Sequence, residues 1–424
     1  MTLLATVLVS SIVVSLAYLA VVTAAAAVAA LRIGGRREDP IDNHDALSES
    51  RFTIPVSLIL TMGEDSTDSV AASQAIAALL GLNYPELEVI VVAEGLPAAI
   101  WASLKAEWEL EAREFFYRQS LATGPVRMIY RSSRDSRLMV ADKAPDSSRA
   151  DAVNCGVNLA RFKYVSALDA DIVFDANALL RAMAAPLRDP ASIVGASSHV
   201  EARDRNPLQR LASIRSLMES RTAARRAAIA PAGGVVVWRR DAIVQLGGFS
   251  TTAADSDLDM TVRVKTSSQV GWQVARSAEI FGHLDAHSAA ARVRLTERRQ
   301  LAALEAVRSL VSDGSDTAGT TMRYLFTSEV LTPFVRAWVV AASVSGAAAG
   351  WISWMDVVFV VLLLSLGQAI VSAAALLLRG SAPGAPDDVT LRRLLLLAPF
   401  EFVLLGPAAA YARGRSLWSF VNRS

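Results

Sequence analysis

The chain has very little cysteine and histidine. Its 424 residues include one cysteine, Cys155, and four histidines. A single cysteine excludes an intramolecular disulfide, which fits a reducing cytosol, and no Cys/His group has the spacing of a metal site. The charge is nearly balanced as well, with 42 basic and 41 acidic residues, and we therefore expect no nucleic-acid partner.

Apolar residues are abundant, and they gather at the two ends of the chain. The mean hydropathy is +0.35. Residues 2–31 carry no charged side chain, and this stretch exceeds the roughly 20 residues that cross a bilayer. A cleaved signal peptide is the alternative, because residues 24–30 are small, but the stretch is too long and lacks a preceding basic segment. We therefore predict a transmembrane anchor over residues 1–31.

Three arginines follow the anchor, namely Arg32, Arg36 and Arg37. The positive-inside rule then places the next segment in the cytoplasm. Residues 51–313 have scattered charges and no spanning run, so they form the predicted cytoplasmic domain. We expect an integral protein of the bacterial cytoplasmic (inner) membrane, with the lipid bilayer as one partner.

A second membrane region is predicted over residues 324–412, followed by a basic tail over 413–424. Three apolar stretches lie in this region, at 330–349, 357–378 and 394–412. Four crossings would place the basic tail outside, which the positive-inside rule disfavours. The second segment could begin as an interfacial helix, or the last could be re-entrant, so three and four crossings both stay open.

Within the cytoplasmic domain, continuous apolar runs alternate with helical segments. The predicted elements are a strand over 55–60, a helix over 69–80, a strand over 87–93, a helix over 98–119, a strand over 126–130, a helix over 151–161 and a strand over 164–168. Such alternation is typical of a doubly wound, Rossmann-like α/β domain whose parallel sheet is covered on both faces. Ligands bind such sheets beyond the carboxyl ends of the strands.

The last of these strands runs into Asp169-Ala170-Asp171. Residues i and i+2 of an extended segment point to the same side, so the two carboxylates converge. Convergent carboxylates suit Mg²⁺ or Mn²⁺, which would neutralise a diphosphate leaving group. A solvated turn with Asp175 as a helix N-cap is the alternative for this motif alone. Lys143 and Arg149 lie upstream, where basic groups could hold phosphate.

A series of segments carries a resemblance to one enzyme family. They are PVSLIL at 55–60, NYPELEVIVV at 83–92, Lys143 with RADAVN at 149–154, LDAD at 168–171, PAGGVVVWRR at 231–240, LGGF at 246–249 and DLDMTVR at 257–263. In this order they resemble the family 2 glycosyltransferases, in particular the membrane-bound branch with cellulose, chitin, hyaluronan and exopolysaccharide synthases. The resemblance implies a GT-A domain flanked by transmembrane helices, a nucleotide-sugar donor and a divalent metal.

The resemblance also implies roles for individual residues. Asp257 takes the position of the catalytic base, which must remove a proton from the acceptor hydroxyl in inverting transfer. The donor and its nucleotide are assigned to Glu94, Lys143, Arg149, Asp151, Asn154 and Asp169. The metal is assigned to Asp169 and Asp171, with His283 as a weaker third ligand. Acceptor or phosphate contacts are assigned to Gly247, Gly248, Arg298 and Arg299.

The chain departs from the family pattern at three places. Glu94 is the sole acidic residue where the family has an aspartate pair, and Ser256 replaces the glutamate before Asp257. The segment at 297–300 lacks the tryptophan that stacks on the acceptor sugar in processive members. The missing tryptophan favours single-sugar transfer over polymerisation, whereas the changes at Glu94, Ser256 and 298–299 motivate the alternative of a relative without catalysis.

The sequence is compatible with two functions. The first is a metal-dependent, inverting glycosyltransferase that transfers a sugar to a glycan or lipid-linked acceptor at the membrane. The second is a catalytically degenerate relative that acts as a membrane scaffold for partners in glycan assembly. In isolation, the acids Asp255, Asp257 and Asp259 also fit a plain helix start, where negative charge is favourable.

Overall fold

The computed structural model divides into two compact units. The sheet unit comprises residues 39–201 and 228–285, and the helical unit comprises residues 1–38, 202–227 and 286–424. The described residues are 3–34, 53–63, 68–114, 117–145, 148–170, 172–203, 206–227, 235–267, 271–285, 289–313, 319–380 and 388–423. Asp171, one of the two predicted metal ligands of the strand end, lies outside the described residues.

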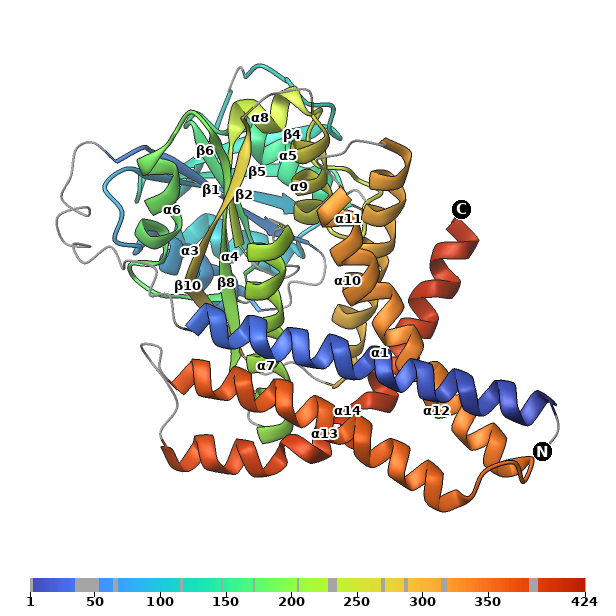
Figure 1. Ribbon diagram of the computed structural model, residues 1–424. Coiled ribbons are helices and arrows are strands. Elements are labelled where there is room, and N and C mark those ends of the chain that lie inside the picture. Colours follow the sequence, from blue (N-terminus) through green and yellow to red (C-terminus); the bar gives the residue numbers. More distant parts are fainter. Residues whose placement is uncertain are drawn as a thin grey trace. The chain divides into compact units, whose positions relative to one another are not determined.

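The sheet unit is built on one ten-stranded sheet (Figure 1). Its order is β3-β4-β5-β2-β1-β6-β9-β8-β10-β7. The strands are β1 (Val56–Met62), β2 (Leu87–Glu94), β3 (Leu110–Arg113), β4 (Val126–Ser132), β5 (Leu138–Lys143), β6 (Tyr164–Leu168), β7 (Ile172–Phe174), β8 (Ile193–Arg203), β9 (Val235–Arg239) and β10 (Gln273–Asp285).

The sheet is parallel at its centre and mixed toward its edges. β1 pairs in parallel with β2 and β6, and β2 pairs in parallel with β5. β9 is antiparallel to both β6 and β8, and β4 is antiparallel to β5. The prediction of a parallel sheet is therefore confirmed for the centre and wrong for the flanks. The parallel strands β1, β2, β5 and β6 bring their carboxyl ends to one edge of the sheet.

Helices cover both faces of this sheet because alternate residues of the central strands point to opposite sides. Leu58 and Leu60 of β1 pack with α3 (Ser69–Leu80), α4 (Ala98–Glu107) and α6 (Ala178–Arg188). Ile59 packs in a second cluster with α5 (Arg149–Leu159), α8 (Arg240–Gln245) and α9 (Ser256–Thr266). Two apolar clusters thus hold the central strands rigidly from both sides.

The predicted helix over 98–119 is wrong in its second half. α4 ends at Glu107, and Trp108 is buried with its indole nitrogen donating a hydrogen bond to the Ser73 hydroxyl. Glu109 then has a φ of 47°, which turns the chain into β3. The strand β5 is the other difference, since the sequence predicted no strand between β4 and α5. The helix α3 and the strand β6 are confirmed at their predicted bounds.

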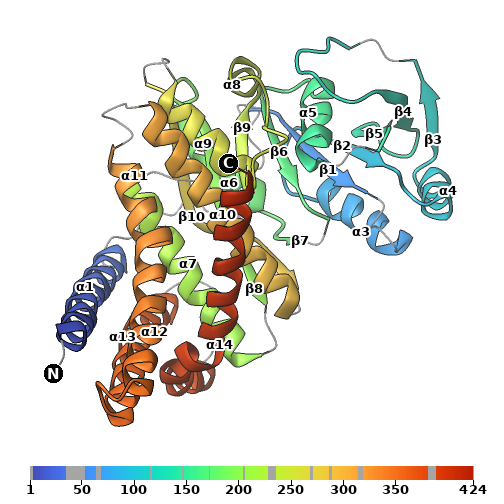
Figure 2. The same cartoon turned by 90° about the vertical axis from the view of Figure 1, so that its right-hand side faces the viewer.

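The helical unit contains the apolar ends of the chain. Its elements are α1 (Leu3–Gly34), α7 (Pro207–Ala227), α10 (Ala289–Asp313), α11 (Gly319–Leu325), the π-helix η2 (Phe326–Leu331), α12 (Thr332–Ala348), α13 (Trp354–Gly380) and α14 (Asp388–Arg423). α14 has Pro399 and Pro407 in its interior and bends along its length (Figure 2).

Within the described residues, four helical stretches are long and apolar enough to cross a membrane. They are Leu3–Arg32, Thr321–Ala348, Trp354–Leu378 and Val389–Asn422. The second stretch contains the π-helix Phe326–Leu331 with the charged residue Glu329. Two helices of the predicted 51–313 domain, α7 and α10, belong to the helical unit by their contacts.

Candidate active site

Asp169 lies at the carboxyl end of the central strand β6. Its side chain is 55% exposed, so it is accessible to a ligand. Arg149, the first residue of α5, holds one carboxylate oxygen, with 2.6 Å from its Nη2 and 2.9 Å from its Nε to Asp169 Oδ1. This contact brings the start of α5, where backbone N–H groups favour anions, to the same edge as the acid.

Asp257 lies in the first turn of α9 and is oriented by its neighbour Asp255. Asp255 is the N-cap of the helix, and its Oδ1 accepts hydrogen bonds from the backbone N–H groups of Asp257 and Leu258. A capping aspartate satisfies N–H groups that have no partner within the helix. Asp255 therefore fixes the helix start that carries Asp257, and the three acids lie at this helix start as the alternative without catalysis expects.

The side chain of Asp257 is held by Trp238 on β9. The indole Nε1 donates a hydrogen bond of 2.8 Å to Asp257 Oδ1. Trp238 is 1% exposed, and a Cβ added at Gly195 of β8 would lie 2.6 Å from its ring. Only glycine leaves room for the indole at that place. The sequence motif contained Trp238, but no role was predicted for it.

The pKa of Asp257 is raised from its ordinary value of 3.8 to about 7. The largest cause is burial, and the negative charges of Asp255 and Asp169 add to it, whereas the Trp238 hydrogen bond and the Arg149 charge oppose it. A general base works best when its pKa is close to the working pH. The predicted base therefore has a proton affinity suited to taking a proton near neutral pH.

Lys143 is completely buried at the end of β5. Its ammonium lies 2.5 Å from Glu94 Oε1 at the end of β2 and 2.5 Å from Asp151 Oδ2 in α5. Asp151 also accepts from the backbone N–H of Gly124. Lys143 thus ties two strand ends, a helix and a loop together. The Glu94 side chain is 12% exposed, whereas that of Lys143 is fully buried.

Gly247 and Gly248 form a turn directly after α8, and Asn154 of α5 contacts this turn. Both glycines have positive φ, 82° for Gly247 and 85° for Gly248, a conformation that residues with a Cβ rarely adopt. The Asn154 amide bonds the backbone of Phe249 twice, donating to its carbonyl and accepting from its N–H. Asn154 is buried, and its two hydrogen bonds to Phe249 stabilise this turn.

Three other predicted residues are not among these contacts. His283 on β10 has its Nε2 3.7 Å from Asp175 Oδ1. Arg299 on α10 belongs to the helical unit, where it pairs with Glu329 at 2.9 Å. Arg298, its neighbour, is exposed. The donor, metal and acceptor roles of all these residues stay predictions.

The acids suit a divalent cation by charge. The negative charges of Asp255 and Asp169 act on Asp257, and Arg149 interacts electrostatically with all three acids. The raised pKa of Asp257 reflects this excess of negative charge together with burial. The described residues contain no group of three acids or histidines that could enclose a metal. Mg²⁺ commonly uses one or two carboxylates and completes its shell with water and substrate phosphates, so a site of this kind still fits.

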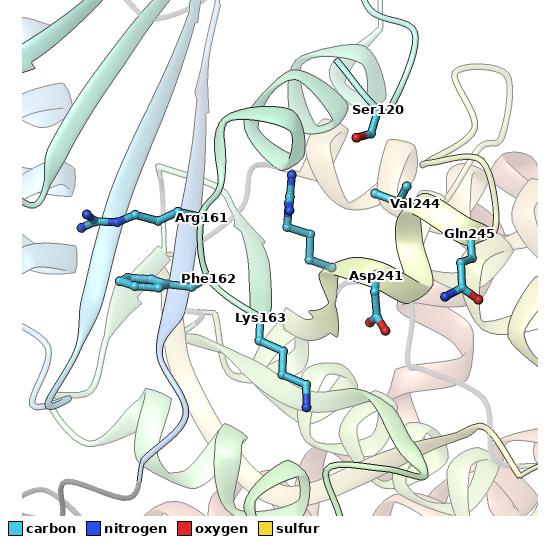
Figure 3. Close-up of a pocket in the computed structure, with 8 residues that line it drawn as sticks. Ser120, Arg161, Phe162, Lys163, Asp241, Val244 and Gln245 are labelled. Carbon is cyan, nitrogen blue, oxygen red and sulfur yellow. The ribbon is translucent and has the colours of Figure 1, made fainter. Parts of the chain in front are cut away.

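A separate pocket of about 540 Å³ is lined by residues 161–163, which precede β6, and by residues of α8, which follows β9 (Figure 3). Its lining includes Arg161, Phe162, Lys163 and Asp241. Lys163 precedes β6, whereas Asp169 follows it, so the two residues lie at opposite ends of that strand. This pocket contains none of the predicted site residues.

The mixed sheet with a parallel centre has the GT-A fold, which a solved structure with a TM-score above 0.5 shares. A mannosyltransferase, PcManGT from Pyrobaculum calidifontis in complex with GDP-Man and Mn²⁺, is similar with a TM-score of 0.56 and 15% identity, over 92% of this chain and 99% of that one. TarS 1–349 of S. aureus with UDP-GlcNAc has a TM-score of 0.42 and 10% identity, over 86% and 92%. A search of curated proteins found no match.

One segment of the chain matches a family model. Residues 125–308 match the family described as glycosyltransferase like family 2. This match and the GT-A fold of the sheet unit together support a glycosyltransferase. The narrower branch of cellulose and chitin synthases stays a prediction.

Proposed function

We propose that the chain transfers a sugar, with inversion, from a nucleotide-sugar donor to a membrane-associated glycan or lipid-linked acceptor. The observation that carries this proposal is the position of the Asp257 side chain. Trp238 holds it by a hydrogen bond, and it interacts electrostatically with both members of the Arg149–Asp169 ion pair. A base and a phosphate-binding group near one another are the two parts that such a transfer needs. The family match and the nucleotide-sugar complexes of the similar structures support it.

The reaction needs one proton transfer and one displacement. The acceptor oxygen forms a bond to the anomeric carbon while its proton passes to a carboxylate oxygen of Asp257. The bond from that carbon to the diphosphate oxygen breaks, and the electron pair leaves with the nucleoside diphosphate. Arg149 and the N-terminus of α5 stabilise the charge that develops on the leaving group.

A divalent cation, Mg²⁺ or Mn²⁺, would add Lewis-acid stabilisation of the leaving diphosphate. Asp169 would hold it, together with Asp171, which lies outside the described residues. The Mn²⁺ in the complex of PcManGT supports this assignment. Arg149 would then exchange part of its contact with Asp169 for the donor phosphates.

The test is release of nucleoside diphosphate by the purified full chain with a panel of nucleotide sugars and Mn²⁺ or Mg²⁺. We expect Asp257→Asn to lose at least about 100-fold in kcat, in the range typical of a removed general base, with donor affinity retained. Asp259→Asn is the matched control, since Asp259 lies on the same helix turn and pairs with Arg263 at 2.8 Å. Full turnover in Asp257→Asn would refute the mechanism.

A scaffold without catalysis is the second candidate, and the Glu94–Lys143 contact favours it. Glu94, the acidic candidate for the nucleotide, already has a cation at 2.5 Å. Calorimetry with nucleotide sugars separates the two functions. A folded protein that binds no donor and releases no diphosphate would be a scaffold, whereas donor binding with turnover supports the enzyme.

A further inference from the structure

Charged side chains lie buried among the apolar helices of the helical unit. Arg215 of α7 bonds Glu401 of α14, with 2.9 Å between Nε and Oε1, and also pairs with Glu219 one turn further along α7. Glu401 is 2% exposed and accepts a second hydrogen bond of 2.6 Å from the Ser372 hydroxyl of α13. Three helices are thus joined through one buried carboxylate.

A second group of charges adjoins the first. Arg299 of α10 donates to Glu329 of η2 and to Ser216, the residue after Arg215. Arg336 of α12 donates to the amide oxygen of Gln368 on α13. Together with Arg413 of α14, these groups form what we call the arginine network: Arg215, Arg299, Arg336, Arg413, Glu219, Glu329 and Glu401.

The arginine network has more positive than negative charge. It contains four arginines and three glutamates, and the pairs described above use Arg215 and Arg299. Arg336 interacts with the charges of Arg215, Glu219, Glu401 and Arg413 but forms no ion pair with a carboxylate in the described part of the chain. Arg413 likewise interacts electrostatically with the other charges of the network and forms no ion pair within the described residues. Both side chains are partly exposed, so a ligand can reach them.

Four of these seven charged residues lie within segments that are apolar enough to cross a membrane, whereas Arg215, Glu219 and Arg299 lie in α7 and α10. Glu329 and Arg336 belong to Thr321–Ala348, and Glu401 and Arg413 belong to Val389–Asn422. Ionisable groups at membrane depth are costly, and apolar residues would pack such helices at least as well. The π-helical turn that carries Glu329 is a further departure from regular structure of a kind frequent at functional sites. The cost of this arrangement points to a ligand rather than to helix packing alone.

The polar face continues along α13. Ser365, Gln368 and Ser372 follow one another at spacings of three and four, which places them on one side of the helix, and all three are buried. Gln368 and Ser372 already bond the network through Arg336 and Glu401. The Ser365 hydroxyl has no hydrogen-bond partner within the described residues. A polar surface therefore extends from the arginines along this helix.

We propose that the arginine network binds the phosphate headgroup of a lipid acceptor, with Arg336 and Arg413 as the residues that contact it. This inference rests on the proposed sugar transfer and names the acceptor class, a phosphorylated lipid. A guanidinium presents a planar pair of donors that matches phosphate oxygens, and the surplus positive charge favours an anion. The apolar faces of the same helices suit the lipid chain.

The experiment measures binding of farnesyl phosphate to the purified full chain by thermal stabilisation, with farnesol as the ligand that lacks only the phosphate. We expect stabilisation by farnesyl phosphate and little by farnesol. Arg336→Gln and Arg413→Gln should each weaken farnesyl phosphate binding about 10-fold or more, as expected for loss of a charge-assisted hydrogen bond. Neither change leaves a paired glutamate without its arginine, so both variants should fold.

Arg392→Gln is the matched control, because Arg392 is an exposed arginine on the same helix as Arg413. Unchanged binding in both network variants would overturn the proposal, and so would equal stabilisation by farnesol. Equal stabilisation by inorganic phosphate would assign the site to a free anion, and equal stabilisation by phosphatidylglycerol would assign it to bulk anionic lipid; either result overturns the acceptor role. Binding of the nucleotide-sugar donor is measured separately and tests the proposed sugar transfer. A failure of lipid-phosphate binding can therefore be distinguished from a failure of the proposed function.

Discussion

The indole nitrogen of Trp238 and the carboxylate of Asp257 are joined by a hydrogen bond of 2.8 Å. The donor sits on a strand whose tryptophan is almost completely buried, while the acceptor sits in the first turn of a helix. The rigid sheet thus fixes the position of a carboxylate whose proton affinity is set by burial and neighbouring acids. This geometry determines how the activity should depend on pH.

The activity should rise with pH through about 7. The pKa of Asp257 is about 7 in the free protein, and the base must be deprotonated to accept the acceptor's proton. Below pH 7, kcat/KM should fall about tenfold per pH unit. A bound divalent cation favours the carboxylate form, so the acid limb of kcat should lie at lower pH than that of kcat/KM. A flat kcat/KM from pH 5 to 8, measured by diphosphate release, would contradict Asp257 as the base.

Replacing the indole should move this pH profile. Trp238→Phe removes a hydrogen bond that favours the charged form of Asp257, so its pKa should rise above 7, by about one unit. Activity at pH 7 should drop about fivefold, because the deprotonated fraction falls from about one half to about one tenth, and it should recover at pH 9. Trp272→Phe is the control, because Trp272 packs against Arg239 and makes no described contact with Asp257. A uniform loss at every pH would indicate damage to the fold instead.

The same raised pKa has a consequence for stability. The folded chain binds the Asp257 proton more tightly than the unfolded chain, so the carboxylate destabilises the fold increasingly as pH rises from about 4 to about 7. Asp257→Asn lacks this charge and should be more stable than the parent at pH 8, by about 1 kcal/mol after allowance for partial exposure. The difference in Tm between the two proteins should vanish near pH 4. If Asp257→Asn were less stable than the parent at pH 8, the Asp257 carboxylate would not destabilise the folded protein, which would contradict the prediction.

The sequence predicted the site best where chemistry and strand pattern coincide. The strand β6 and the acid that follows it were predictable because an apolar run of fixed length ends in Asp169. The order of the acids along the chain also indicated Asp257. The structure adds that Arg149 is close to both acids, which a linear sequence does not show.

Features that depend on packing between distant segments were not predictable. Trp238 and Asp257 lie 19 residues apart on different elements, and their contact requires the space that Gly195 leaves on a third. The strand β5 was missed because its apolar run is short and ends in Asp142 and Lys143. A lysine can be buried at a strand end only when carboxylates from other segments neutralise its charge, as Glu94 and Asp151 do for Lys143.

Lys143 provides the last prediction, since it joins Glu94 and Asp151 without being exposed. Lys143→Met leaves two largely buried carboxylates facing each other, and we expect a loss of about 3–5 kcal/mol in the free energy of unfolding. Thermal unfolding of the purified chain measures it. Lys163→Met is the control, because Lys163 is exposed and forms no described ion pair. The double variant Lys143→Met/Asp151→Asn should recover part of the loss, because one of the repelling charges is gone. If the single variant is as stable as the control, the carboxylates find another partner and Lys143 is not what holds these strand ends together.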